Sequence, residues 1–236
     1  LWGLPSDAHA GMTGLSDTMS PGSISRLAQS ADIAFRARFE GALPAKQKLY
    51  WRGPVMEDFD GTTWRPHPGR GAALALESLS PPVRYETTLE AHNQRWLLAL
   101  DAPIQLPAEV SLNDTLAATQ RQTLTERRRF QFSASLDYRF NVAEDARTLQ
   151  RNLALPARAN PQARALAEGW RQAGHTPQAI IGKAQALFAA SFTYTLQPPL
   201  LGENGIDEFL FRTQRGFCEH YAGAFVFLMR AAGVPA

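Results

Sequence analysis

A single cysteine in the chain of 236 residues, Cys218, lies where nucleophilic chemistry is possible. It comes two residues after Gly216 and opens an apolar run that ends at Gly233, which predicts a helix that begins near the thiol. Thiols attack as thiolates, and the free N–H groups and macrodipole of a helix N-terminus stabilise that anion. The same N–H groups can bind the oxyanion that forms when an acyl group is attacked. Gly216 would leave room for a substrate backbone to approach the sulfur.

The predicted cysteine helix has one apolar stripe that includes the thiol. Its members recur at steps of three and four residues: Cys218, Tyr221, Ala222, Phe225 and Met229. This spacing predicts that the sulfur lies at the N-terminal end of the face that packs inward. Free cysteines are also among the most frequently buried residues, so position alone leaves a small core residue as the alternative to a nucleophile.

The nearest candidate for a general base is His220. Residues two apart on a helix point in nearly opposite directions, so His220 is expected to be a surface or packing residue and not the base for Cys218. The five histidines are far apart without metal-ligand spacing, and one cysteine cannot supply paired thiolates. We therefore expect neither a metal nor another cofactor.

The region before the cysteine helix has the periodicity of helices. Asn160-Pro161 and Thr176-Pro177 each place a capping residue directly before proline at the first helical position. After the second of these dipeptides, apolar residues share one helical face: Ile180, Ile181, Ala184, Leu187 and Phe188. A short β-like stretch follows at residues 192–196.

The upstream half has the period of β-strands. Apolar residues at every second position mark residues 33–40 as a half-buried strand. Further strands are expected at residues 49–53, 83–89, 95–100 and 129–138. Asp60-Gly61 between two apolar runs predicts a hairpin turn. Because the connections carry prolines, as the edges and turns of antiparallel sheets do, a β-sandwich is the first choice for this half.

These periodicities predict an α+β chain with an extended leading segment at 1–30, a β-rich domain at 31–142 and a helical region at 143–236. The formal net charge is +2, and the one basic run, Arg127 to Arg129, is expected to point outward from the start of a strand. We therefore expect no nucleic-acid partner. No segment reaches the roughly 18 apolar residues of a membrane-spanning helix. Because Leu1 is not a natural start, we expect a segment of a longer protein.

The C-terminal part of the chain resembles the bacterial transglutaminase-like core. The resemblance is carried by residues 206–210 (IDEFL), 215–222 (RGFCEHYA) and 228–235 (LMRAAGVP), with Tyr194 upstream of them. Further stretches extend it over nearly the whole chain: residues 14–22 (GLSDTMSPG), 49–55 (LYWRGPV) and 59–64 (FDGTTW). Together they are similar to one subgroup, the membrane-anchored transglutaminase protein A (TgpA) type of Gram-negative bacteria.

This resemblance implies that the helical region is the first part of a papain-like core with a Cys-His-Asp triad. Cys218 matches the family's nucleophile, whereas the family's histidine and aspartate lie downstream of the segment that ends at Ala236 and are assigned to no residue here. The family also uses an upstream aromatic residue to polarise the acyl oxygen. Tyr194 is the positional candidate for that role, and a packing tyrosine is the alternative.

The missing relay leads to two expectations. Acyl transfer needs a base for the thiol proton and an acid that orients the base, so we expect these 236 residues to be inactive alone. We also expect the stripe through Ala222 and Phe225 to be exposed and available for self-association.

The leading functional prediction is the periplasmic domain of an inner-membrane enzyme, anchored by helices outside this segment. It would transfer acyl groups from glutamine or peptide amides of a cell-envelope protein or peptide through a thioester on Cys218. A thiol peptidase or amidase, with water as the acceptor, is the close alternative. A third possibility is a β-rich envelope-binding module with a non-catalytic core, in which Trp51, Trp64 and Trp96 would form an exposed ligand face.

Overall fold

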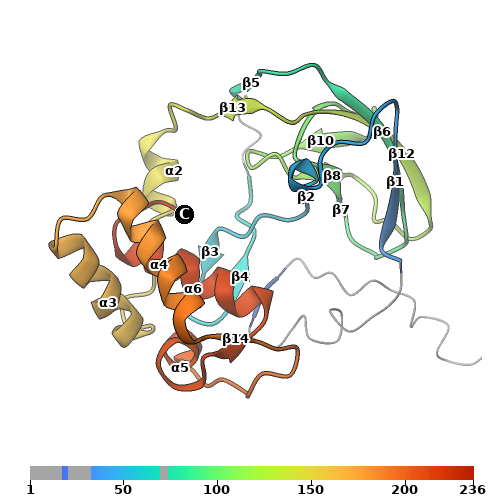
Figure 1. Cartoon of the computed structure of the whole chain (residues 1–236). Helices are drawn as coiled ribbons and strands as arrows, with labels where there is room; N and C mark the ends of the chain where they lie inside the picture. The colour runs from blue at the N-terminus through green and yellow to red at the C-terminus, as the bar shows by residue number, and fades with distance from the viewer. Residues whose placement is uncertain (1–17, 21–32, 70–73) are drawn as a thin grey trace, which may run out of the picture. The chain divides into compact units, whose positions relative to one another are not determined.

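The structure, a computed structural model, describes residues 18–20, 33–69 and 74–236 (Figure 1). These residues form two compact units. The first contains residues 33–55, 68–69 and 74–143, and the second contains residues 18–20, 56–67 and 144–236. The predicted leading segment at 1–30 lies outside the described residues except for residues 18–20.

The first unit consists of two antiparallel sheets with a shared core. One sheet has the order β1 (Phe35–Phe39), β6 (Val83–Leu89), β12 (Arg128–Ser135) and β9 (Ala102–Gln105) (Figure 1). The other has the order β10 (Val110–Leu112), β11 (Ala118–Gln120) and β7 (Trp96–Leu97). One buried cluster takes side chains from both sheets, including Tyr85, Leu97, Val110 and Phe132. This arrangement confirms the predicted antiparallel β-sandwich-like half.

Short strand pairs complete the β-structure. In the first unit β2 (Trp51–Arg52) pairs with β8 (Ala99–Leu100), and β5 (Leu76–Ser78) pairs with β13 (Tyr138–Phe140). A single 3-10 turn, η1 (Lys46–Lys48), precedes β2. The strand predicted at 95–100 is therefore divided into β7 and β8, which pair with different neighbours.

The tryptophans do not form an exposed face. Trp96 is buried and stacks on His92 with ring centroids 4.3 Å apart. Trp51 is half-buried and packs edge-on against Phe35, at 4.8 Å. Trp64 is buried as well. The binding-module hypothesis thus loses the surface on which it depended.

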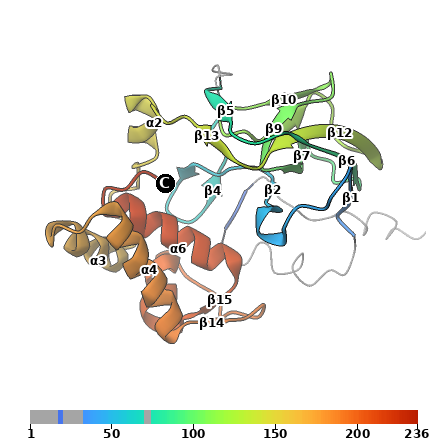
Figure 2. The same cartoon turned by 45° about the horizontal axis from the view of Figure 1, so that its top comes forward.

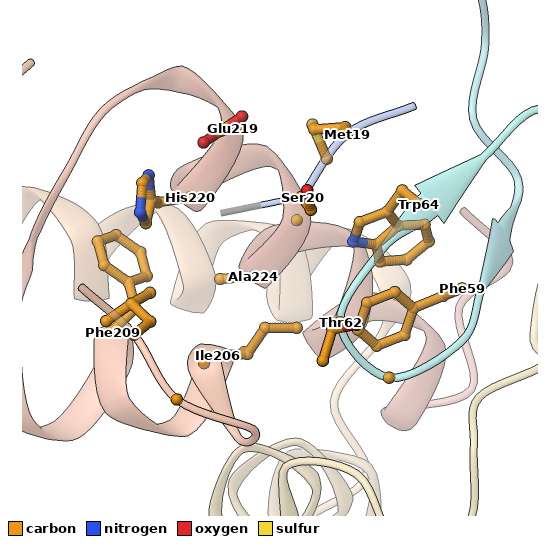
Figure 3. A pocket seen from close by; sticks show the side chains of 15 residues that line it. Met19, Ser20, Phe59, Thr62, Trp64, Ile206, Phe209, Glu219, His220 and Ala224 are labelled. Carbon is orange, nitrogen blue, oxygen red and sulfur yellow. The ribbon is translucent and has the colours of Figure 1, made fainter. Parts of the chain in front are cut away.

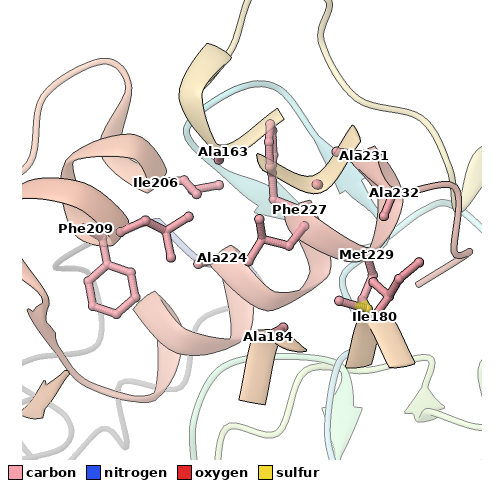
Figure 4. Close-up of a cluster of buried hydrophobic side chains, with 13 residues drawn as sticks. Ala163, Ile180, Ala184, Ile206, Phe209, Ala224, Phe227, Met229, Ala231 and Ala232 are labelled. Carbon is pink, nitrogen blue, oxygen red and sulfur yellow. The ribbon is translucent and has the colours of Figure 1, made fainter. Parts of the chain in front are cut away.

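The second unit is mainly helical. Its helices are α2 (Ala146–Arg151), α3 (Pro161–Gln172), α4 (Pro177–Ser191), α5 (Gly205–Glu208), the π-helical turn η2 (Phe209–Thr213) and α6 (Cys218–Ala231). Both α3 and α4 pack on α6 (Figure 2). Figure 4 shows side chains of the resulting core, which include Ile180, Phe209, Ala224 and Phe227. No helix among the described residues is both long and apolar enough to cross a membrane.

The two predicted proline-marked helix starts are both present, but only one is capped as expected. The Thr176 hydroxyl accepts the N–H of Ala179, 3.3 Å away, and caps α4. Asn160 directly precedes α3 in a left-handed conformation with φ 49°, and its side chain does not cap that helix.

Asn160 and Asp207 instead cap each other's helices. The Asn160 Oδ1 accepts the N–H groups of Ile206 at 3.0 Å and Asp207 at 3.2 Å, at the start of α5. The buried Asp207 carboxylate accepts the N–H of Ala163 at 2.7 Å, at the start of α3. The predicted role of the Asn160 side chain was wrong because a carboxylate, the stronger acceptor, comes from a distant part of the chain.

A hairpin from within the predicted β-rich domain belongs to the second unit. Its strands are β3 (Asp58–Phe59) and β4 (Trp64–Arg65), and the rings of Phe59 and Trp64 stack 4.4 Å apart. Asp60 accepts backbone N–H groups of residues 62–63, which confirms the predicted turn. The Arg65 guanidinium and these N–H groups hold the pKa of Asp60 well below its usual value. The hairpin packs on the helices because the Phe59 ring lies edge-on to Phe227 of α6.

Candidate active site

Cys218 is the first residue of α6, and its side chain is exposed. This position agrees with the predicted helix start. The expected inward-packing stripe was right only in part: Met229 is buried, and Tyr221 and Phe225 pack on the core at half burial, whereas Cys218 and Ala222 are exposed. Helices cover α6 on two sides, because Arg164 of α3 lies over the Phe227 ring and Phe188 of α4 packs on the Tyr221 ring.

The predicted stripe becomes more buried along α6, from its exposed start at Cys218 to Met229. Ala222 is exposed, Tyr221 and Phe225 are half-buried, and Met229 is buried. The sulfur therefore lies at the accessible end of this stripe. Its exposure favours a reactive thiol over the alternative of a small core residue.

The first turn of α6 is closed by a reciprocal pair of hydrogen bonds. The N–H of His220 donates to the carbonyl of Phe217 at 2.9 Å, and the N–H of Phe217 donates to Nδ1 of His220 at 3.4 Å. Because Nδ1 is the acceptor, the proton of the neutral imidazole is on Nε2. The residues on either side of the thiol are thus held while the thiol itself remains open.

His220 is a packing residue. Its ring lies 4.7 Å from that of Phe217 and 5.5 Å from that of Phe209, and burial lowers its pKa. Gly216 makes this packing possible, because a Cβ there would lie 2.7 Å from the Cβ of His220. Gly216 is itself buried, so its predicted role in admitting a substrate backbone was wrong.

Tyr194 is brought to the start of the cysteine helix by a small parallel sheet. In this sheet β14 (Thr193–Tyr194) pairs with β15 (Arg215–Gly216), so that Tyr194 lies opposite Gly216. The Tyr194 side chain is 62% exposed, and its ring stacks on that of Tyr221 with centroids 6.1 Å apart. Tyr221 is three residues after Cys218, so its side chain lies on the same side of α6 as the thiol.

Tyr221 is a site residue that the sequence analysis treated only as part of a stripe. Burial, together with the neighbouring Tyr194, raises its pKa. It also touches three rings of the core, those of Phe188, Phe192 and Phe209. The spacing of three residues from the cysteine was the available signal, whereas the contact with Tyr194 depends on the fold.

The far end of α6 is anchored by a buried cation that the sequence analysis also missed. Arg230 is 4% exposed, and its Nε donates to the carbonyl of Ala236 at 2.8 Å and its Nη1 to that of Ala154 at 3.1 Å. The guanidinium lies 5.0 Å from the centroid of the Trp64 ring. Burial lowers the pKa of Arg230, and the charge of Glu57 opposes this shift.

Comparison with known proteins shows two matching families. The family described as "TgpA N-terminal domain" matches residues 1–141, and the "Transglutaminase-like superfamily" matches residues 164–236. The chain is 43% identical over 239 residues to the protein-glutamine gamma-glutamyltransferase of Pseudomonas aeruginosa, which covers 100% of this chain and 36% of the relative. The chain thus spans about a third of that curated relative's length. A stretch of 49 residues is 41% identical to YebA of Bacillus subtilis and covers 20% of this chain and 7% of YebA.

Two crystal structures of the periplasmic domain of TgpA from Pseudomonas aeruginosa have the same fold. The one bound to ethylmercury has a TM-score of 0.89 and 44% identity, and covers 94% of this chain and 80% of that chain. The other has a TM-score of 0.89 and 43% identity, and covers 95% of this chain and 79% of that chain. These matches confirm the predicted resemblance and fold class. They also agree with the predicted periplasmic location.

Proposed function

Because the chain belongs to the TgpA family of transglutaminase-like proteins, we propose that it carries the nucleophile of an enzyme that transfers glutamine acyl groups to primary amines. The observation that carries the proposal is the exposed thiol of Cys218 at the first position of α6. A curated relative named protein-glutamine gamma-glutamyltransferase supports it. We further propose that the substrate is a protein or peptide of the cell envelope, and that helices outside these residues hold the enzyme at the inner membrane.

The proposed reaction has two acyl-transfer steps. The Cys218 thiolate attacks the side-chain amide carbon of glutamine, and the amide oxygen takes the negative charge. Backbone N–H groups at the start of α6 and the Tyr194 hydroxyl are the candidate donors to this oxyanion. The C–N bond then breaks, ammonia leaves with an added proton, and a thioester remains. A primary amine attacks the thioester and gives up a proton, the sulfur leaves as thiolate, and a secondary amide forms, which is an isopeptide bond when the amine is a lysine side chain.

The thiol also needs a base. His220 does not supply it, because its Nδ1 already accepts the N–H of Phe217 and its ring is buried. We assign the base and its orienting acid to no described residue. We also propose that α6 self-associates through Ala222, which is exposed, and Phe225, which is half-buried.

One assay separates transfer from hydrolysis. The full-length protein that carries these residues is incubated with a glutamine peptide and a biotin-labelled primary amine. We expect release of ammonia together with covalent incorporation of the amine, and loss of both in the Cys218→Ser variant. Release of ammonia without incorporation would identify the amidase alternative, and cleavage of the peptide backbone the peptidase alternative. Absence of all three products would contradict the proposal.

A further inference from the structure

We propose that Tyr221 is a positioning residue, which holds the Tyr194 side chain beside the thiol so that the Tyr194 hydroxyl can donate to the oxyanion. The inference rests on the proposed function and deepens it, because it names a residue that acts through Tyr194. Three observations support it. The backbone of Tyr194 is fixed, its exposed side chain stacks on Tyr221, and Tyr221 is itself held by the core.

The backbone of Tyr194 is fixed near the start of α6. The N–H groups of the residues on either side of it donate to the carbonyls of Gln214 and Gly216, each at 2.8 Å. These bonds hold Tyr194 against β15, the strand that ends two residues before Cys218. The pairing fixes where the Tyr194 side chain begins, but it does not fix the torsion angles of that side chain.

The Tyr194 side chain takes its orientation from a stack. Because it is 62% exposed, little of the protein encloses it, and an exposed side chain has several staggered rotamers available. Among the described residues, the ring that it contacts is that of Tyr221, with the two planes 24° apart and the centroids 6.1 Å apart. This distance lies within the range in which aromatic rings attract each other. The stack therefore favours one orientation of Tyr194.

Tyr221 is held in turn by rings of the core. Its ring lies edge-on to Phe188 at 5.3 Å and to Phe209 at 5.2 Å, and it also contacts Phe192 at 6.1 Å. Phe209 is 1% exposed, and its ring lies 5.5 Å from that of His220, which Figure 3 shows next to it. One buried ring thus supports both the closed first turn of α6 and Tyr221.

The stack lies on the side of α6 that carries the thiol. Cys218 and Tyr221 are three residues apart, so their Cβ atoms are neighbours on the helix surface, about 5–6 Å apart. A donor to an oxyanion must be oriented before the charge develops, because reorientation during the reaction slows the chemical step. Tyr221 provides this orientation for the Tyr194 hydroxyl.

The first test measures kcat and KM of the full-length protein with a glutamine peptide and a primary amine. Tyr221→Leu removes the ring, so kcat should fall at least about tenfold while KM changes little, because the donor is misplaced and substrate binding is retained. Tyr221→Phe keeps the stacked ring and should recover most of this loss.

The matched control for the lost ring is Trp170→Leu. Trp170 is a half-buried ring of the same core, on α3, without a ring contact to Tyr194 or Tyr221. Its removal should lower the melting temperature and leave kcat unchanged. A fall in kcat as large as that in Tyr221→Leu would overturn the inference, because loss of core packing would then explain both.

A double-mutant cycle separates positioning from packing. In Tyr194→Phe no hydroxyl remains to be oriented, so the addition of Tyr221→Leu should lower kcat by less than about twofold more. An equal loss from Tyr221→Leu in both backgrounds would overturn the inference, as would a Tyr194→Phe variant with unchanged kcat. In the last case, amine incorporation by the unchanged protein would still support the proposed function.

A measurement without turnover tests the stack itself. 3-Fluorotyrosine is incorporated at position 194 of the full-length protein, and its fluorine NMR shift reports the ring current of a stacked neighbour. We expect the shift to be retained in Tyr221→Phe and Trp170→Leu, and to move to the value of free 3-fluorotyrosine in Tyr221→Leu, or in Tyr221→Met if Tyr221→Leu does not fold. An unmoved shift would overturn the inference. If the unchanged protein incorporates no amine, the proposed function fails, and the fluorine shift still decides whether Tyr221 holds Tyr194.

Discussion

The two ends of α6 differ in almost every physical respect. At the start, Cys218 is exposed and the turn is closed by the Phe217 and His220 pair. At the end, Arg230 is buried and donates to two backbone carbonyls from outside the helix. A nucleophile must be accessible, yet it must also be held in place. The difference indicates that the buried end of α6 fixes the helix so that its open end can present the thiol.

Removing the nucleophile should have the largest effect. In Cys218→Ser, the hydroxyl is a far weaker nucleophile at neutral pH, so amine incorporation should fall by at least about 1,000-fold. The melting temperature should remain unchanged, because the Cys218 side chain is exposed. An assay of amine incorporation and a thermal melt of the same preparation check both. Residual activity within tenfold of the unchanged protein would contradict the assignment.

Removing the anchor should affect stability. Arg230→Met retains a long side chain but leaves the carbonyls of Ala154 and Ala236 without their charged donor, which should cost about 3 kcal/mol of unfolding free energy. Arg212→Met is the matched control, because Arg212 is exposed and pairs with Glu208 one turn away. Exposed pairs of this kind contribute about 0.3–0.5 kcal/mol. Urea denaturation measures the unfolding free energy of both variants. Equal losses in the two would refute the role of Arg230 as an anchor of α6.

Removing one hydroxyl should separate catalysis from packing. Tyr194→Phe retains the ring that stacks on Tyr221 but loses the candidate oxyanion donor. A lost donor of this kind costs about 100-fold in kcat, and KM should change little. Tyr221→Phe is the control, with the same atom removed from the partner ring. Equal effects of the two variants on kcat would show that Tyr194 serves only in packing.

The smallest predicted effect concerns pH. Burial lowers the pKa of His220 below its ordinary value of 6.5, so the unfolded chain takes up a proton at higher pH than the folded chain. This contribution to stability is complete above pH 6.5 and is lost as the pH falls below it. Glutamine at this helix position can accept the Phe217 N–H without titrating. His220→Gln should therefore reduce the loss of unfolding free energy between neutral and acidic pH.

The control for the pH prediction is His175→Gln, which removes a histidine just before α4, away from the cysteine turn. Denaturant titrations at several pH values would measure the dependence in both variants. An unchanged slope in His220→Gln would contradict the account of the turn.

Features set by neighbouring residues could be predicted from the sequence. The β6 strand has the predicted bounds, Val83–Leu89, because its alternation is a local property. The α4 helix begins at Pro177 with Thr176 as its cap, and the predicted face of this helix contains the buried Ile180 and Ala184. The start of α6 at Cys218 followed in the same way from the glycine and the apolar run.

Features set by residues distant in the sequence could not be predicted. The Asn160 side chain caps α5, which is more than 40 residues away in the sequence, and not the adjacent α3. The Asn160-Pro161 dipeptide was therefore misleading about the role of this side chain. Every face of α6 except its polar first turn carries apolar or small residues, so periodicity alone did not show that Ala224 and Phe227 face the core. The hairpin of β3 and β4 alternates like its neighbours, and only its packing on Phe227 places it in the second unit.

Trapping of the acyl-enzyme tests the central claim most directly. The full-length protein is mixed with a glutamine peptide in the absence of an amine, quenched in acid and analysed by intact-protein and peptide mass spectrometry. We predict an adduct on Cys218 with the mass of the peptide less one ammonia, which disappears when a primary amine is added. An adduct on another residue, or turnover that persists in the Cys218→Ser variant, would contradict the claim that the exposed thiol at the head of α6 is the nucleophile.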